Sequence, residues 1–599
     1  MSETTDLLAG INADVLLALA RKLGAPATAT RKPELIAALD QLVHGDTQRI
    51  LDHLSDAERK LVAEAAYGGG GVDTVRFAAK YGVKCPLPAR HVYPPSTASP
   101  LLLLIGDQYG PRRLPDSVAK VLRTLLEEPA AVKVTATDSL PAVYAPPSNR
   151  RTQTPRPIHA YESERTVFLE LRSVLKLVHA GKLKVTDKSR RPTEDAVRLI
   201  GEVLVVPDFL LEPPAEEITQ YTERAGAVRA HAWGVLVQQC GWAKARSGRL
   251  TLTPAGQKLL TSCTAAKLAM GVMEFLGDDD FDEFNRIHHI RGQSGGGRRY
   301  LTSPSERKAA IGDSIKEWPL KQWIAFDEAA RYIWAAGHGF DVTEADHTLY
   351  FCEFQYGMLG DQYAEINRQY LRAVLFESLA TLGLIDVAYV YPHRLWPELG
   401  DCWGVDDLSF CGRYDGLLYV RLNALGAYCL RITGAYEAAI PQAAAAFRVL
   451  PNREIALLDS GQPSPADRHM LEQFAAPKSE FVWELNAGRI LSYLESGGSV
   501  DEALRFLESN SSSPIPQTVQ TMLADLTRGS TAVSGAVDAI LIEFKDATTA
   551  ALIAHDTRAA KYCHLAGTRR LAVPKQNLRA FRSAIGKLGF VIPNGQLPS

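Results

Sequence analysis

Three motifs that would identify an enzyme of a known kind are missing from this 599-residue chain. No G-x-x-x-x-G-K-[ST] loop occurs, although a nucleotide-driven motor needs one to hold phosphates with backbone N–H groups and a Lys. The histidines His288, His289 and His338 do not stand in an H-E-x-x-H pattern, and the run Gly292–Gly297 lacks the G-x-G-x-x-G order of a dinucleotide site. We therefore expect no catalytic residue, no cofactor, no metal ion and no enzymatic activity.

Cysteine pairs and long apolar runs are missing as well. The eight cysteines include no C-x-x-C pair, which argues against a zinc ribbon and against a disulfide framework. No apolar run reaches the roughly 18 residues that a membrane-spanning helix needs, and the polar, acidic start at Met1 does not resemble a signal peptide. We expect a protein of the reducing cytoplasm without a membrane partner.

An excess of charge of either sign is also absent, since 66 Lys and Arg face 68 Asp and Glu. Any surface for nucleic acid must therefore be local. Hydrophobic residues make up 46% of the chain, as in ordinary globular proteins, and its length predicts several domains.

The first 45 residues are predicted to form two short helices around an extended joint. Arg31 and Lys32 begin the second helix. This pattern resembles a SAP-like module, in which these two residues would contact phosphates at a helix N-terminus. A small helical hairpin that caps the next domain explains the same pattern.

Residues 46–140 follow the order of a helix-turn-helix or winged-helix-like domain. Ser55 and Glu58 form a capping box, in which each side chain satisfies a backbone N–H of the other residue. A short buried strand is predicted at Leu101–Ile105, followed by a helix.

Three later segments share one order: helix, helix, then a two-stranded wing. The first runs over Glu164–Leu211, the second ends with Gly241–Gly256 and the third with Leu382–Gly426. In the last two, strand, turn, strand and a (Thr/Asn)-x-x-Gly helix start follow one another, as in winged helices. The predicted fold class is therefore mainly α with small β wings (α+β). Residues 158–265 are predicted to form tandem winged-helix modules, and residues 266–440 a winged-helix domain with a basic loop.

Two acidic motifs are interpreted as structural. Asp278, Asp280 and Asp282 alternate as at the start of a calcium-binding EF-hand loop, but other residues stand where that loop needs Gly and Glu. We expect a solvated acidic turn there. Asp327-Glu328 imitates the acidic box of a helicase, but the pattern around it is helical and no phosphate-binding loop precedes it.

Local excesses of Lys and Arg predict contacts with nucleic acid. Between Lys176 and Arg198, seven basic residues face three acidic ones, and Lys182 and Lys184 share one side of a strand because alternate residues do. A basic strand and loop that lead into a helix suit a DNA backbone, and a solvated wing is the alternative. The candidate phosphate ligands are Lys182, Lys184, Lys188, Arg190 and Arg191.

A second cluster lies around a glycine-rich stretch. It contains Arg291, Arg298, Arg299, Arg307 and Lys308. Tyr300 follows the arginine pair, so this stretch is predicted either to track phosphates with Arg298 and Arg299 and to stack a base, or to serve as a charged linker.

The strongest cluster lies near the end of the chain, where Arg558–Lys587 contains eight Lys and Arg and no Asp or Glu. Arg579 and Arg582 are three residues apart on one helical face, while Phe581 and Ile585 are predicted to face the core. We expect DNA as the partner, with an acidic protein surface or a merely solvated face as alternatives. The candidate ligands are Arg558, Lys561, Arg569, Arg570, Lys575, Arg579 and Arg582.

The segment Phe447–Ile592 contains stretches that resemble a known module: Pro451-Asn452-Arg453 after a predicted strand, Ile490–Leu504 with a Gly break between two helices, Ser513–Val519, and Leu571–Pro574. They resemble the N-terminal, DNA-facing domain of XPB-type helicases. The whole chain resembles bacterial helicase-associated proteins in which winged helices precede this module and an ATPase is lacking. The resemblance implies a C-terminal α/β helicase-associated domain over residues 445–599 that engages DNA, and the missing motor argues against unwinding.

These expectations combine into a non-enzymatic DNA-binding accessory protein. It would engage double- or single-stranded DNA for a separately encoded ATPase, helicase or nuclease, in DNA repair or in defence against foreign DNA. One alternative is a protein–protein scaffold or adaptor, because winged helices bind proteins as well as DNA. The other is a transcription regulator, although no helix is rich in base-reading Arg, Asn and Gln together.

Overall fold

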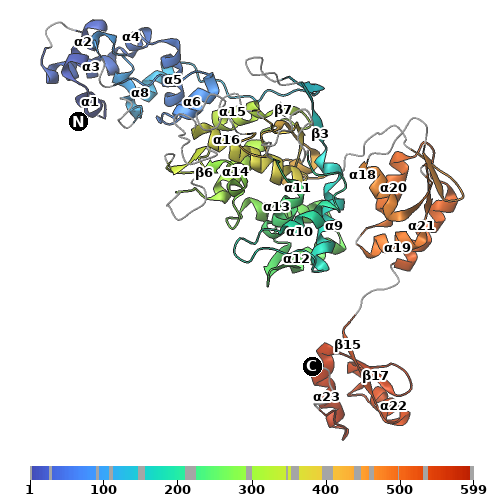
Figure 1. The fold of residues 1–599 in the computed structure, drawn as a ribbon. Coiled ribbons are helices and arrows are strands. Elements are labelled where there is room, and N and C mark those ends of the chain that lie inside the picture. The colour runs from blue at the N-terminus through green and yellow to red at the C-terminus, as the bar shows by residue number, and fades with distance from the viewer. Residues whose placement is uncertain are drawn as a thin grey trace.

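The computed structural model consists of helices and small sheets (Figure 1). About 50% of it is helix and 14% is strand, so the mixed α+β class is confirmed. The residues that the structure describes are 3–25, 30–89, 93–106, 112–145, 155–209, 224–291, 300–345, 348–351, 363–393, 395, 409–436, 447–457, 465–479, 481–496, 498–530 and 537–593.

Eight helices at the N-terminal end, blue in Figure 1, share one hydrophobic core. They are α1 (Glu3–Ala9), α2 (Ala13–Lys22), α3 (Lys32–Gly45), α4 (Thr47–Asp52), α5 (Asp56–Tyr67), α6 (Thr74–Tyr81), α7 (Leu102–Ile105) and α8 (Asp116–Leu125). Ser55 and Glu58 form the predicted capping box at the start of α5. Lys32 donates to Ala9 O (2.8 Å) and so ties α3 to α1. The first three helices therefore pack into the same core as the helices that follow them.

Helix α7 replaces the buried strand that was predicted for Leu101–Ile105. All five side chains of that run are buried in the N-terminal core. The strand prediction was wrong because a run that is apolar on every side carries no periodicity, which is the signal that separates strand from helix.

Helices α6 and α15 (Phe326–Ala336) join the N-terminal unit to the central region. From α6, Arg76 Nε donates to Ala335 O at the end of α15 (3.3 Å). From α15, Arg331 Nη1 donates to Ala79 O near the end of α6 (3.4 Å). The last carbonyls of a helix have no N–H partner within that helix. Here an arginine from each helix donates to such a carbonyl of the other helix, so the two helices cap each other.

The central region, cyan to yellow in Figure 1, contains two units with the same order of elements around one continuous core. The first unit comprises α9 (Val167–His179), an extended bridge at Lys184, α10 (Glu194–Gly201), α11 (Arg229–Gln239), β4 (Ala243–Arg246), β5 (Arg249–Leu252) and α12 (Pro254–Thr261). The second comprises α14 (Pro304–Ile315), β7 (Trp323–Ala325), α15, α16 (Tyr363–Ala373) with the π-helix Val374–Leu379, β9 (Ile385–Tyr389), β10 (Leu417–Leu422) and α17 (Ala424–Cys429). Strand β3 (His159–Tyr161) extends the second unit's sheet to the order β3-β9-β10-β7.

The described part of the central region thus forms two units where the sequence predicted three segments of this kind. The segment Glu164–Leu211 was expected to carry its own two-stranded wing. Instead, Leu250 N donates to Leu183 O and Val185 N to Gly248 O, both at 2.9 Å, so its extended piece is the third strand of the β4–β5 hairpin. The sequence could not show this, because the partner strand follows only after α10 and α11.

The (Thr/Asn)-x-x-Gly motifs occupy equivalent places in the two units. Thr253 Oγ1 accepts from Gly256 N (3.1 Å) at the start of α12, and Asn423 Oδ1 accepts from Gly426 N (2.9 Å) at the start of α17. A Cβ on either glycine would lie within 2.0 Å of a main-chain oxygen just before the first hairpin strand. Glycine is therefore required where the last helix crosses the hairpin.

The segment Phe447–Ile592, expected to be one domain, contains two hydrophobic cores. The first body, orange in Figure 1, consists of β11 (Phe447–Val449), β12 (Glu454–Leu457), α18 (Pro465–Phe474), β13 (Ala475–Ser479), β14 (Val482–Leu485), α19 (Ala487–Glu495), α20 (Val500–Asn510) and α21 (Gln517–Ser530). The second, red, consists of β15 (Ala539–Glu543), α22 (Ala547–His555), β16 (His564–Leu565), β17 (Arg570–Pro574) and α23 (Leu578–Gly586).

These two bodies differ in charge. Residues 447–530 contain seven Lys and Arg against eleven Asp and Glu, whereas residues 537–593 contain nine against four. Most of the stretches that carry the helicase resemblance lie in the first body, residues 447–530, in which Asp and Glu outnumber Lys and Arg. A net positive charge within this segment is therefore confined to the last body.

Candidate nucleic-acid interface

A three-stranded sheet in the first unit exposes one of its sides to solvent. Strands β4 and β5 meet at Ser247-Gly248, where φ is +47° and +70°, as a tight two-residue hairpin turn of type I′ requires. The strand at Lys184 pairs with the other edge of β5. Leu183 and Leu250 are fully buried, so the residues that alternate with them face outward.

Five cations project from the outer side of this sheet, and we call them the basic sheet face: Lys182, Lys184, Lys244, Arg246 and Arg249. Lys184 stands opposite Arg249, and Arg249 stands opposite Arg246, so three positive side chains lie next to one another across three strands. Lys182 and Lys244 lie two residues away along their strands and therefore point to the same side. All five side chains are exposed.

The sequence had identified only part of this face. Lys182 and Lys184 were predicted to share a side, and the exposed Lys188 continues the positive charge into the adjoining turn. The three cations of the hairpin were missed. Their signal was the alternation of Lys244 and Arg246 before a two-residue turn and a third cation directly after it, which places all three on one side of a hairpin.

The basic sheet face concentrates like charge. Alternate residues of a strand are about 7 Å apart and neighbouring strands about 4.8 Å, so the five charges occupy a patch of roughly 7 by 10 Å. Like charges directly opposite one another destabilise a sheet. Within the described ranges, no carboxylate forms an ion pair with any of these five cations, and Arg249 Nη1 donates to Gly181 O (2.8 Å). The patch is therefore suited to binding an external polyanion.

Arg190 and Arg191, which were predicted together with the lysines, face other partners. Arg190 Nη2 lies 3.0 Å from a carboxylate oxygen of Asp280. Arg191 is half-buried and lines a small cavity beside Glu377 and Arg286, and burial together with the charge of Arg286 lowers its pKa. In this conformation neither arginine adds to the basic sheet face.

The third helix of each unit is buried. Nine of the eleven residues of α11 are buried. Between positions 365 and 379, on α16 and the π-helix, every residue except Arg368 is buried. Helix α11 packs against the π-helix, and polar side chains there are bound inside the protein, as when Gln369 donates to Asp415 (2.8 Å). Among the side chains of these helices whose burial is described, none is exposed enough to enter a DNA groove.

A buried charge cluster around Glu377 connects these two helices. Arg286 Nε donates to Glu377 at 3.2 Å, the Tyr414 hydroxyl donates to it as well, and His231 Nδ1 lies 3.4 Å away. Burial alone would raise the pKa of Glu377, but Arg286 and His231 outweigh it and hold that pKa well below the usual range. Burial lowers the pKa of His231. The cluster therefore contains a buried carboxylate balanced by the buried guanidinium of Arg286. Because Arg286 Nη2 also donates to Ala227 O just before α11 (3.0 Å), Arg286 links the two helices.

The second sequence cluster does not form a described surface. Arg298 and Arg299 lie outside the described residues. Arg307 and Lys308 are 1% and 0% exposed, so they are not available to phosphates. The sequence predicted that this cluster would track phosphates or form a charged linker, but α14 places the side chains of Arg307 and Lys308 in the interior.

The acidic turn at residues 278–283 supplies the partners of these buried cations. Asp282 accepts from Arg307 (2.9 Å), and Asp278 lies 3.7 Å from Lys308. Asp279 accepts from Ser303 (2.7 Å) at the start of α14. The prediction of a solvated acidic turn was therefore right for Asp279 and Asp280, which are exposed. It was wrong for Asp278 and Asp282, which neutralise buried cations that the sequence alone cannot place inside.

The basic stretch Arg558–Lys587 is distributed over two sides of the last body. Leu571 and Val573 of β17 are buried beneath α22 and α23, so Arg570, which alternates with them, faces the opposite, open side of the sheet. Arg579 and Arg582 are exposed on α23, on the helical side, while Phe581 and Ile585 are buried as predicted.

Acidic residues from outside this stretch pair with part of it. Ion pairs form between Arg558 and Asp556 (3.6 Å), Arg570 and Glu543 (3.4 Å), and Lys575 and Asp538 (3.6 Å). The charge count along the sequence therefore overstated the positive surface. Lys561, Arg569 and Arg579 remain as exposed cations without a carboxylate partner among the described residues. Arg582 is exposed as well, and its Nη2 donates to Ile592 O (3.5 Å).

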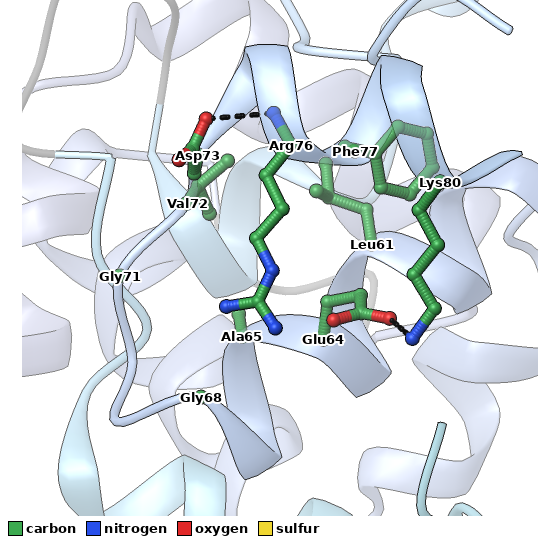
Figure 2. A pocket seen from close by; sticks show the side chains of 10 residues that line it. All are labelled: Leu61, Glu64, Ala65, Gly68, Gly71, Val72, Asp73, Arg76, Phe77 and Lys80. Atoms are coloured by element: carbon green, nitrogen blue, oxygen red, sulfur yellow. Dashed lines mark hydrogen bonds and ion pairs between the residues drawn. The ribbon is translucent and has the colours of Figure 1, made fainter. Parts of the chain in front are cut away.

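A hollow of about 290 Å³ lies between α5 and α6, where α6 follows the glycine-rich turn (Figure 2). Figure 2 shows Lys80 directed at Glu64, with which it forms an ion pair at 2.6 Å, and the backbone N–H of Arg76 bound to Asp73. The Arg76 side chain caps α15, as described above. The charges that line this hollow thus have protein partners, which leaves it without a free cation for an anionic ligand.

Other kinds of site are not found in the described part of the chain. No group of three or more His, Cys, Asp or Glu there is arranged to hold a metal ion. No helix in the described ranges is long and apolar enough to cross a membrane. A comparison with models of protein families gives no match, and a comparison with curated proteins gives none either.

Proposed function

We propose that this chain binds the phosphate backbone of DNA through the basic sheet face, without reading the base sequence. The observation that carries the proposal is the row Lys184, Arg249 and Arg246, three neighbouring cations without a carboxylate partner in the described structure. Phosphates that bind such a row release their condensed counter-ions, and this release supplies the affinity.

We interpret both central units as winged helices, since their element order matches a helix-turn-helix followed by a wing. Among the residues that the structure describes, only the first unit has a basic wing. In the second, Arg421 of the corresponding hairpin is bound to Asp386 (2.8 Å) and Glu162 (3.3 Å). The buried third helices favour contact with the backbone over contact with base edges, and this argues against the alternative of a sequence-specific transcription regulator.

The wider role that we propose is that of a non-enzymatic, cytoplasmic accessory protein. It engages DNA for a separately encoded helicase or nuclease, in DNA repair or in defence against foreign DNA. The resemblance of the C-terminal segment to an XPB-type helicase domain supports this role, as does the lack of a phosphate-binding loop in the sequence. The exposed cations of the last body, around Arg579, provide a second DNA contact in this proposal, and two linked contacts bind more tightly than either one alone.

The test is a charge variant of the basic sheet face. Lys184, Arg246 and Arg249 are all changed to Gln, and binding to two labelled duplexes of unrelated sequence is measured by fluorescence anisotropy at low salt. A control variant changes three exposed cations of the N-terminal unit, Arg21, Lys84 and Lys120, to Gln and so alters the net charge by the same amount.

We expect the wild-type protein and the control variant to bind both duplexes with equal affinity, and the basic-sheet-face variant to bind both at least tenfold more weakly. Failure of the wild type to bind DNA at low salt contradicts the proposal and favours the scaffold alternative. An equal loss of affinity in the control variant contradicts it as well. Co-purification of an ATPase or nuclease with the full chain tests the wider role.

A further inference from the structure

Arg190 lies next to the basic sheet face, but its charge is held by an acidic residue. Its guanidinium lies 3.0 Å from Asp280, and the guanidinium carbon lies 4.9 Å from the centre of the Phe281 ring. The pair is half-exposed, with 39% of the Arg190 side chain and 66% of the Asp280 side chain accessible to solvent. An ion pair in such a position is weak, so a competing anion can separate it.

Asp280 differs from the other carboxylates of its turn. Asp278 and Asp282 pair with buried cations and Asp279 accepts from the start of α14, and these contacts hold the turn in place. Among the described residues, Asp280 makes its ion pair with Arg190 and with no other cation. The turn thus keeps its anchors when the Asp280 carboxylate is removed.

The backbone that carries Arg190 is also fixed independently of its side chain. Thr186 N donates to Arg191 O and Arg190 N donates to Thr186 O, both at 2.9 Å. Gln238 Nε2 from α11 donates to Arg190 O at 2.9 Å. The guanidinium can therefore leave Asp280 while the turn, which also carries the exposed Lys188, stays in position beside the sheet.

We propose that Asp280 occupies the place of a phosphate on Arg190 in the free protein, and that DNA displaces it when Arg190 joins the basic sheet face. This inference rests on the proposed function. A carboxylate and a phosphate compete for the same guanidinium fork, since both accept paired hydrogen bonds from it. Asp280 accordingly weakens the binding of DNA, and Arg190 is the residue through which it does so.

The experiment is a double-mutant cycle on duplex binding by the full chain, with Asp280→Asn, Arg190→Gln and the double variant. We expect D280N to tighten Kd by about two- to fivefold, the range of a half-exposed ion pair, because Arg190 no longer has to be released. We expect R190Q to weaken binding. In the R190Q background, D280N should have no effect, because the residue that it frees is gone.

The control is Asp313→Asn, which removes an exposed carboxylate that is likewise paired with a surface cation, Lys316. It should leave Kd unchanged. The inference is overturned if D280N does not tighten binding. It is also overturned if D280N tightens binding as much in the R190Q background as in the wild type, since the effect is then one of net charge. Failure of the proposed function looks different: the basic-sheet-face variant then binds DNA as well as the wild type does.

Discussion

Replacing Glu377 with leucine tests whether the buried charge cluster holds the two third helices together. Glu377 is 5% exposed and accepts hydrogen bonds from Arg286 and Tyr414. Leucine fills a similar volume but accepts no hydrogen bond, so the guanidinium of Arg286 is left charged and unpaired in the interior. Removal of one partner of a buried ion pair costs about 3–5 kcal/mol. A matched substitution at Asp195, an exposed partner of Arg198, should cost less than about 1 kcal/mol.

The assay is hydrogen–deuterium exchange of the backbone amides of α11, because a chain with several cores is not expected to unfold in one step. A loss of about 3–5 kcal/mol in the local opening free energy corresponds to exchange that is faster by roughly two to four powers of ten. The reasoning is refuted if exchange in α11 accelerates by less than about tenfold, or if Asp195→Leu accelerates it as much as Glu377→Leu.

Two further predictions concern the central region. Gly426→Ala should lower the local opening free energy of the central region by about 1–3 kcal/mol or more, because its Cβ would lie 1.9 Å from Leu384 O. Gly586→Ala, with nothing within 4 Å of its Cβ, should leave the last body equally stable or more stable. Equal changes in amide exchange in the two bodies that carry these substitutions would contradict this. Burial, aided by the charge of Arg413, lowers the pKa of His288 in the folded protein to about 2. Below about pH 6.5 only the unfolded chain therefore binds a proton at this position. The stability of the folded state should fall as the pH falls below about 6.5, by up to about 1.4 kcal/mol per pH unit. His288→Gln, which keeps an acceptor for Arg413, should flatten the pH dependence of the central region's opening free energy between pH 5 and 6.5, measured by amide exchange. An unchanged slope would count against this role of His288.

Local features of the fold were readable from the sequence. The capping box of Ser55 and Glu58 depends on residues within one turn, so the pattern contains all the information that is needed. The extent of a unit was not readable in this way. The strand at Lys184 finds its partner, Arg249, only after two intervening helices, and the sequence therefore predicted an additional wing.

The candidate interface was predictable to the extent that strand alternation determines it. Alternation placed Lys182 and Lys184 on one side, and the same argument could have included the hairpin cations. It could not foresee that Arg307 and Lys308 are buried against the acidic turn, or that carboxylates outside the last basic stretch pair with Arg558. Neutralisation is a property of tertiary contacts, so a charge count along the chain gives only an upper limit for a positive surface.

The most direct measurement is the salt dependence of duplex binding by the wild type and by the variant with Gln at positions 184, 246 and 249. Each phosphate that a cation neutralises contributes about 0.9 to the slope of log K against log salt concentration. If the three cations bind one phosphate each, the slope of the variant is shallower by about 2.7, while the Arg21, Lys84 and Lys120 control keeps the wild-type slope. Equal slopes for the wild type and the variant, with DNA bound by both, would contradict the claim that DNA is held by this face.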